Sequence, residues 1–110
     1  MTPTHLDDDL AVSGQIGAGD IARLAASGVR AIICNRPDGE EPGQPPFAEI
    51  ENAAEAAGIE ARYVPVSPSG ATPADVQDMK QALDGLPRPL LAYCRSGARS
   101  RAILAAAGAK

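Results

Sequence analysis

The chain has 110 residues, of which 45% are hydrophobic and 22% are charged, a composition typical of one folded domain rather than of two domains or a disordered segment. The net charge of -4 argues against a surface for nucleic acid or for an anionic membrane, so neither is expected as a partner. The acidic residues 1–10 are unlike a signal peptide, and no apolar stretch approaches the roughly 18 residues of a membrane span, which predicts a cytoplasmic protein.

The expected elements alternate between strand and helix. After a loose acidic lead at residues 1–9, hydrophobic spacing and glycine or proline stops predict, in chain order, a strand at 10–13, a helix at 20–27, a strand at 29–34, a helix at 47–57, a strand at 61–66, a helix at 72–85, a strand at 90–93 and a helix at 99–107.

Local residue types refine these elements. Asp20 is expected to cap the first helix, and Thr72 is expected to cap the third, with Pro73 in its first turn. The segment 35–46, rich in proline and glycine, predicts an irregular loop. Loops of about this length in compact domains usually serve a function.

The alternation predicts an α/β fold in three layers, with helices on both faces of a mostly parallel sheet and the whole chain, 1–110, as one domain. Such sheets carry their functional sites at the carboxyl ends of the strands. Cys34 and Cys94 each end a predicted strand, so both are expected at that edge.

The segment 90–100 carries the strongest functional signal. Its strand delivers Cys94 into a tight turn that opens a helix, and the N–H groups there favour an anion. The planar guanidinium group of Arg99 is suited to binding an oxyanion through two hydrogen bonds. Ser100 can donate a hydrogen bond to the sulfur of Cys94. Such surroundings lower a thiol pKa, which predicts a thiolate nucleophile at Cys94. The turn, which we call the anion-binding loop, consists of Arg95, Ser96, Gly97 and Ala98.

The alternative for this segment is structural. A free cysteine is often a small buried core residue, and the neighbouring arginines would then be solvated. A cysteine at a strand end, followed by a glycine turn, an arginine and a helix, favours the functional interpretation.

Four segments carry a family resemblance. They are VSGQI (12–16), NRPDGEE (35–41), YVPV (63–66) and YCRSGARS (93–100). In this order they resemble the phosphatase-like domain of beta-lactamase-hydrolase-like proteins, over residues 10 to 101. The resemblance implies a dual-specificity-phosphatase-like fold and a cysteine enzyme of the rhodanese and cysteine-phosphatase group.

The same resemblance implies a biological setting. The family is small and bacterial, and its domain occurs alone or fused to a metallo-β-lactamase-type domain, a combination linked to sulfide and persulfide metabolism. The final helix of this chain is expected to be shorter than is usual for the family. The thin, alanine-rich core fits either a homodimer or a fused or partner enzyme of sulfur metabolism.

Two reactions fit these residues. The active-site loop of cysteine phosphatases has the pattern C-x5-R, usually with a histidine before the cysteine. In this chain only four residues separate Cys94 from Arg99, and Tyr93 precedes the cysteine. Both features are similar to rhodaneses. A phosphatase also needs a general acid. Segment 67–70 has no carboxylate where related phosphatases tend to have an aspartate, which leaves Asp38 as a substitute.

The leading interpretation is therefore a sulfurtransferase that forms a persulfide on Cys94 and takes a small anionic, thiol or persulfide substrate. The alternatives are a protein-tyrosine or dual-specificity-type phosphatase, which hydrolyses a phosphate ester through a phosphocysteine, and a non-catalytic sensor of anions or thiols.

Residues outside the anion-binding loop carry weaker signals. Cys34 is a candidate resolving thiol if its strand neighbours that of Cys94, and otherwise a core cysteine. With one histidine and two separated cysteines, neither a metal site nor a cofactor is expected. The predicted loop contributes four charged side chains, either as a flap over the site or as a structural turn: Arg36, Asp38, Glu40 and Glu41.

Overall fold

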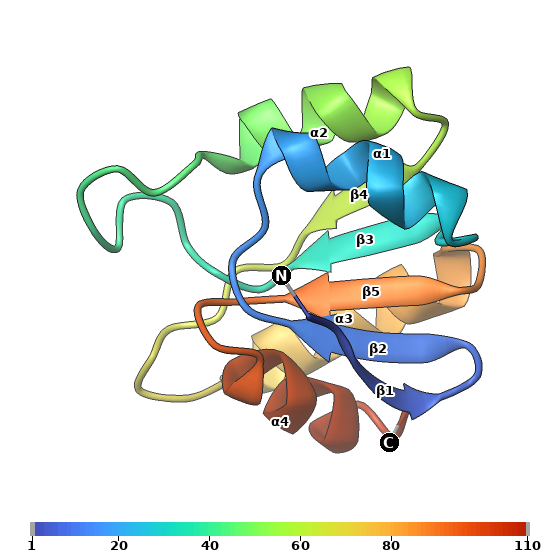
Figure 1. Cartoon of the computed structure of the whole chain (residues 1–110). Coiled ribbons are helices and arrows are strands. Elements are labelled where there is room, and N and C mark those ends of the chain that lie inside the picture. Colours follow the sequence, from blue (N-terminus) through green and yellow to red (C-terminus); the bar gives the residue numbers. More distant parts are fainter. Residues whose placement is uncertain (1, 110) are drawn as a thin grey trace.

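A computed structural model describes residues 2–109 and arranges five strands in one sheet, in the order β1-β2-β5-β3-β4 (Figure 1). The strands are β1 (Thr4–Asp7), β2 (Leu10–Ser13), β3 (Ala31–Cys34), β4 (Glu60–Tyr63) and β5 (Leu90–Tyr93). The helices are α1 (Ala18–Ala26), α2 (Phe47–Ala56), α3 (Pro73–Gly85) and α4 (Ala98–Ala106). β1 is antiparallel to β2 and the other pairs are parallel, which confirms the predicted fold class.

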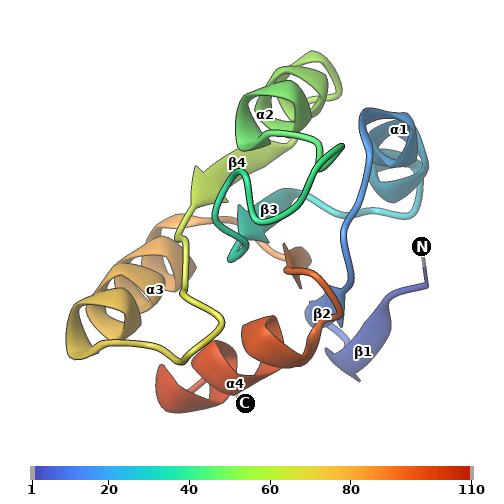
Figure 2. The ribbon, with the colours of Figure 1, turned by 90° about the vertical axis from the view of Figure 1, so that its left-hand side faces the viewer.

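The sheet separates two layers of helices, α1 with α2 and α3 with α4 (Figure 2). Side chains alternate across a strand, so the central strand β5 serves both layers. Leu90 and Ala92 pack in the layer of α3 and α4, whereas Leu91 and Tyr93 pack in the layer of α1 and α2. Parallel strands need both faces covered, which explains the continuous apolar run of β5.

Of the two predicted helix caps, the structure confirms the one at α3 and not the one at α1. The Thr72 hydroxyl accepts from the Asp75 N–H at 3.1 Å, and the Asp75 carboxylate accepts from the Thr72 N–H at 2.9 Å, which confirms the cap of α3. The expected cap of α1 is wrong, because α1 begins after Gly17. Asp20 lies in its first turn and accepts from the Gly17 N–H at 2.8 Å.

The expected loose lead is wrong for residues 4–7, which form the edge strand β1; residue 1 lies outside the described residues. β1 is held to β2 through backbone pairing, and only its Leu6 packs against the core. The other side chains of β1 are exposed, so the sequence carries no apolar alternation that would indicate a strand.

β4 ends at Tyr63, before the predicted end at residue 66, because Pro65 has no N–H to continue the ladder. The N–H groups of Val64 and Val66 still donate to the carbonyls of Cys34 and Asn35, both at 2.9 Å. The segment after β4 therefore stays attached to the sheet at its carboxyl edge.

The four parallel strands end at one edge of the sheet, on the left in Figure 1, where the connections that follow them come together. This edge is where the sequence predicts the functional site. Among the described residues, no helix is long and apolar enough to cross a membrane.

Candidate active site

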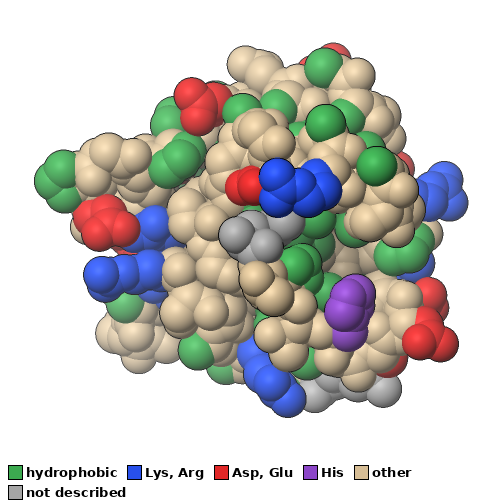
Figure 3. Space-filling model, in the orientation of Figure 1, with side chains coloured by type: hydrophobic (Ala, Val, Ile, Leu, Met, Phe, Trp, Pro, Cys, Tyr) green, Lys and Arg blue, Asp and Glu red, His purple; other side chains and the backbone are tan. Residues whose placement is uncertain are grey.

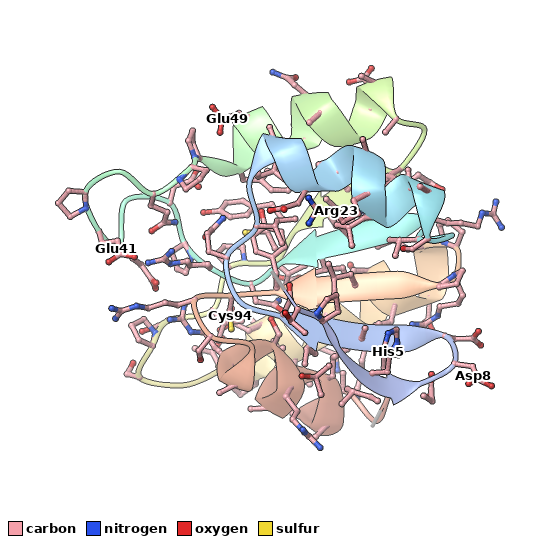
Figure 4. The ribbon with its side chains drawn as sticks, viewed as in Figure 1. His5, Asp8, Arg23, Glu41, Glu49 and Cys94 are labelled. Carbon is pink, nitrogen blue, oxygen red and sulfur yellow. The ribbon has the colours of Figure 1, made fainter. Side chains whose placement is uncertain are left out.

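Cys94 follows β5 directly and is 1% exposed at the carboxyl edge of the sheet (Figure 4). Its N–H donates to the Ser13 carbonyl at 3.3 Å, which continues the pairing of β5 with β2. The chain then turns back, and the Gly97 N–H donates to the Cys94 Sγ at 3.0 Å. The loop therefore curls around the thiol, as the sequence predicts.

Gly97 makes the turn from this loop into α4. Its φ of +98° lies in the left-handed region that side chains disfavour. A Cβ at this position would also lie 3.4 Å from the Ser13 carbonyl carbon. Gly97 is the N-cap of α4, so the helix begins beside the sulfur and directs its positive end there.

The pKa of the Cys94 thiol is set by opposing effects. Burial on its own raises this pKa, whereas hydrogen bonds from the N–H and hydroxyl of Ser100 lower it. The N–H groups of Ser96 and Gly97 lower it further, and the resulting pKa of Cys94 is below that of an ordinary cysteine. At a given pH, the thiolate fraction of Cys94 is therefore larger than that of an ordinary cysteine.

The Ser100 hydroxyl has a single proton and two acceptors within reach. Its Oγ donates to the Asn35 Oδ1 at 2.8 Å, so it cannot give the same proton to Cys94 at that moment. The N–H of Ser100, in the first turn of α4, has no intrahelical acceptor and is the steadier donor to the sulfur.

Arg99 is fixed in the first turn of α4 with its side chain 15% exposed. Its Nη1 donates to the Glu40 Oε2 at 2.7 Å and to the Val66 carbonyl at 3.0 Å, and its Nη2 donates to the Glu40 Oε1 at 3.3 Å. Hydrogen bonds from Arg99 lower the pKa of Glu40, so this carboxylate is ionised and holds the guanidinium in one orientation.

Arg36 connects this ion pair to the loop 35–46. The Arg36 side chain is 2% exposed, and its Nε donates to the Glu40 Oε1 at 2.9 Å. Its other nitrogens donate to the Glu41 Oε1 at 2.7 Å and the Gln15 Oε1 at 3.1 Å. Glu40 is therefore shared by two arginines, and the loop is fixed to the site through this ion-pair network.

Asp38, the expected substitute for a general acid, serves the loop itself. Its carboxylate accepts from the N–H of Phe47, the first residue of α2, at 2.9 Å. Its own N–H donates to the Tyr63 hydroxyl at 2.9 Å. The structure therefore places Asp38 at the start of α2 and does not bring it to Cys94.

Cys34 is likewise kept apart from Cys94. β3 and β5 are neighbours, but Cys34 is in register with Tyr93, and both side chains pack in the layer of α1 and α2. The Cys34 Sγ donates to the Arg36 carbonyl at 3.3 Å, and burial raises the pKa of the Cys34 thiol. Cys94 opens instead toward α4, so the two thiols lie on opposite faces of the sheet.

A cleft of about 570 Å³ opens from Cys94 between α4 and the segment that follows β4. Arg95 lies at its mouth with its side chain 69% exposed, 3.9 Å from the Glu41 carboxylate, and Figure 3 shows acidic and basic side chains together on this edge. No carboxylate of residues 2–109 lines the cleft. The lining residues are Val66, Ser67, Pro68, Gly70, Ala71, Cys94, Arg95, Ser96, Ala98, Arg99, Ala102, Ile103 and Ala106.

Comparison with known proteins assigns this geometry to a family. Residues 4–110 match the family described as "Beta-lactamase hydrolase-like protein, phosphatase-like domain". The chain belongs to this family. Beta-lactamase hydrolase-like proteins from Agrobacterium fabrum C58 and Xylella fastidiosa Temecula1 are both 37% identical over 100 residues, which is 91% of this chain and 23% of each relative. The chain thus spans about a quarter of the length of these curated relatives.

Solved structures support the same architecture. A protein from Neisseria meningitidis Z2491, named "putative phosphatase", is 38% identical with a TM-score of 0.81, over 90% of this chain and 70% of that one. The kinase associated phosphatase is 18% identical with a TM-score of 0.76, over 89% of this chain and 63% of that one. The second likeness concerns the fold alone. The dual-specificity-phosphatase-like fold is confirmed.

Two residues of this phosphatase-like domain, Gly14 and Gln15, support the anion-binding loop from the neighbouring strand end. The Gln15 N–H donates to the Arg95 carbonyl at 3.3 Å. A Cβ on Gly14 would lie 2.9 Å from that same carbonyl oxygen. From the sequence, Gly14 is predicted only to end a strand. Its place in the VSGQI segment, which carries the family resemblance, is the one sequence signal for a role at the site.

Gly14→Ala is expected to lower the kcat/KM of the reaction at Cys94 by about 10- to 100-fold, because the added Cβ displaces the Arg95 carbonyl and with it the loop. Steady-state kinetics measure the loss. Gly19→Ala in α1 is the matched control, since a Cβ there meets no atom within 4 Å. Equal activity of the two variants would contradict the role of Gly14.

None of the described residues 2–109 forms a group of three or more His, Cys, Asp or Glu side chains that could hold a metal ion.

Proposed function

We propose that the domain is a cysteine-dependent phosphatase that hydrolyses a phosphate monoester through a phosphocysteine on Cys94. One observation carries the proposal: a thiol with a lowered pKa lies in a ring of N–H donors at a helix N-terminus, in the same cleft as Arg99. The match to a phosphatase-like family and the likeness to phosphatase structures support this reaction over sulfur transfer.

The reaction has two steps. The Cys94 thiolate attacks phosphorus, an S–P bond forms, and the ester O–P bond breaks, with the electron pair leaving on the ester oxygen. Water then attacks the phosphocysteine, the S–P bond breaks, and inorganic phosphate and the thiolate are released. Arg99 and the N–H groups of the anion-binding loop stabilise the charge on the phosphoryl oxygens in both steps.

The leaving group receives little help from the protein. No carboxylate of residues 2–109 lines the cleft, and Glu40 is ionised by its hydrogen bonds with Arg99. The ester oxygen therefore leaves as an anion or takes its proton from water. This favours esters of acidic alcohols, such as phenols, over esters of alkyl alcohols.

Sulfur transfer is the second candidate, and the absence of a carboxylate among the described lining residues favours it. The Cys94 thiolate would attack the outer sulfur of a donor such as thiosulfate, break the S–S bond and release sulfite. The resulting persulfide would pass its outer sulfur to an acceptor thiolate. No step of this scheme needs a general acid.

Parallel assays with p-nitrophenyl phosphate and with thiosulfate plus cyanide separate the two candidates. The phosphatase predicts release of inorganic phosphate and, after an acid quench, a phosphoryl group on the peptide that contains Cys94. Cleavage after lysine and arginine places Cys34 in a different peptide, which serves as the internal control. Thiocyanate production with a sulfur atom added at Cys94, and no phosphate release, would replace the proposal by sulfur transfer.

The ionisation of Cys94 predicts a pH dependence. Because the surrounding hydrogen bonds lower the pKa of Cys94, the thiolate fraction should rise with pH along a limb whose midpoint lies below that of an ordinary cysteine. The rate of alkylation by iodoacetamide, measured against pH in Cys34→Ser protein, reports this midpoint. Ser100→Ala removes the hydroxyl but keeps the N–H, so it should move the midpoint to higher pH. An unchanged midpoint would show that the Ser100 hydroxyl does not lower the pKa of Cys94.

A further inference from the structure

The cleft beside Cys94 extends well beyond the reacting sulfur. Ala98, Ala102 and Ala106 are exposed on one stripe of α4 and line it on one side. At 1.5 Å per residue, this stripe is about 12 Å long. Pro68 and Ala71, from the segment that follows β4, line the opposite side. A phosphoryl group occupies only the end at Cys94, so most of the cleft is free for the rest of a substrate.

Charge is segregated along this cleft. Among its lining residues, all of them in the described part of the chain, the charged side chains are Arg95 and Arg99, which belong to the end at Cys94. The far part runs along α4 past Ala102 and Ala106 and the buried side chain of Ile103. The lining from the segment after β4 is also uncharged; it consists of Val66, Ser67, Pro68, Gly70 and Ala71. An anion is favoured at the first end, whereas a second charge at the far end would lose solvation without gaining a partner.

We infer that the substrate is an anion with an elongated apolar group: a monoester of an alkylated phenol or a similar alcohol, with its charge confined to one end. The inference rests on the proposed function, since it extends the substrate of the same site. Alanine side chains leave room for an alkyl chain or an aromatic ring along α4, and burial of that group supplies affinity. Polyanionic substrates, such as nucleotides with several phosphates, are disfavoured by the uncharged far end.

Binding of unreactive phosphonates tests the inference without turnover. Isothermal titration calorimetry compares benzylphosphonate with derivatives that carry a methyl, butyl or carboxyethyl group at the ring position opposite the phosphonate. The affinity should rise by up to about fourfold per methylene along the alkyl series. The carboxyethyl derivative should bind no better than the unsubstituted compound, because its charge lies against apolar lining.

Two leucine variants locate the binding. Ala102→Leu fills the cleft and should abolish the gain of the butyl derivative over benzylphosphonate. Ala105→Leu places the same side chain on an exposed position of α4 outside the lining, and it should leave the gain unchanged. Leucine is a good helix former, so both variants should fold, which thermal unfolding checks.

The outcomes are distinct. A flat alkyl series, or equal effects of Ala102→Leu and Ala105→Leu, overturns the inference even if the protein hydrolyses phenyl phosphate. A rising series that Ala102→Leu abolishes supports an anion with an elongated apolar group as the ligand of the cleft. If no phosphate ester is then turned over, the proposed hydrolysis, and with it the monoester, fails while this class of ligand stands.

Discussion

Replacement of Cys94 by serine is expected to lower turnover of p-nitrophenyl phosphate by at least about a thousandfold, the order of loss seen when an enzyme loses its nucleophile. The hydrogen bonds around this position lower the pKa of a thiol. A serine hydroxyl starts from a far higher pKa, so the same donors leave it protonated. Steady-state phosphate release measures the loss, and acid quench should recover no phosphoryl group on the variant.

Cys34→Ser is the matched control. Cys34 is equally a buried cysteine after a parallel strand, but it packs in the layer of α1 and α2 and donates to the Arg36 carbonyl. A serine can keep that hydrogen bond, so activity should stay within about twofold of the natural protein. A comparable loss in both variants would show that folding, rather than the nucleophile, accounts for the effect at Cys94.

Arg99→Lys is expected to lower kcat/KM by about 100- to 1,000-fold, although the positive charge is kept. The Arg99 guanidinium lines the cleft and is held in place by hydrogen bonds to Glu40 and to the Val66 carbonyl. A lysine ammonium cannot reproduce the planar, two-pronged hydrogen bonding of the guanidinium. Steady-state kinetics with p-nitrophenyl phosphate measure the loss. The effect should appear in kcat as well as KM, because the lost interactions strengthen as the phosphoryl group transfers.

Arg101→Lys provides the comparison for this substitution. Arg101 lies on the same helix, is exposed, and is outside the lining of the cleft, so the Arg101→Lys variant should retain full activity.

Glu40→Gln should lower activity less than Arg99→Lys does, because it loosens the Arg99 guanidinium without removing it. Full activity of Arg99→Lys would exclude the guanidinium from the reaction.

The sequence predicts best what is local along the chain. Cys94, Gly97 and Arg99 lie within six consecutive positions, and a strand, a turn and a helix start suffice to bring them together. The cap of α3 is equally local, because Thr72 and Asp75 are separated by one helical turn.

Contacts between segments that are distant in the chain are harder to predict from the sequence. The approach of Gly14 to the Arg95 carbonyl depends on β2 and β5 being neighbours in one register. Cys34 lies at a strand end, as predicted, but the register pairs it with Tyr93, and this one-residue offset sends its thiol to the opposite face. Asp38 has the chemistry of an acid, yet the Phe47 N–H gives it a structural partner that its position in the loop does not reveal.

The shared carboxylate of Glu40 constrains how this domain can change. Arg36 and Arg99 both depend on it, one from the loop 35–46 and one from α4. Loss of Glu40 leaves a nearly fully buried Arg36 with fewer partners and a loosened Arg99 in the same step. The loop is therefore not an exchangeable module: a loop transplanted from a relative must supply a carboxylate at position 40 that suits both arginines, so substitutions at positions 36, 40 and 99 are expected to be accepted together rather than one at a time.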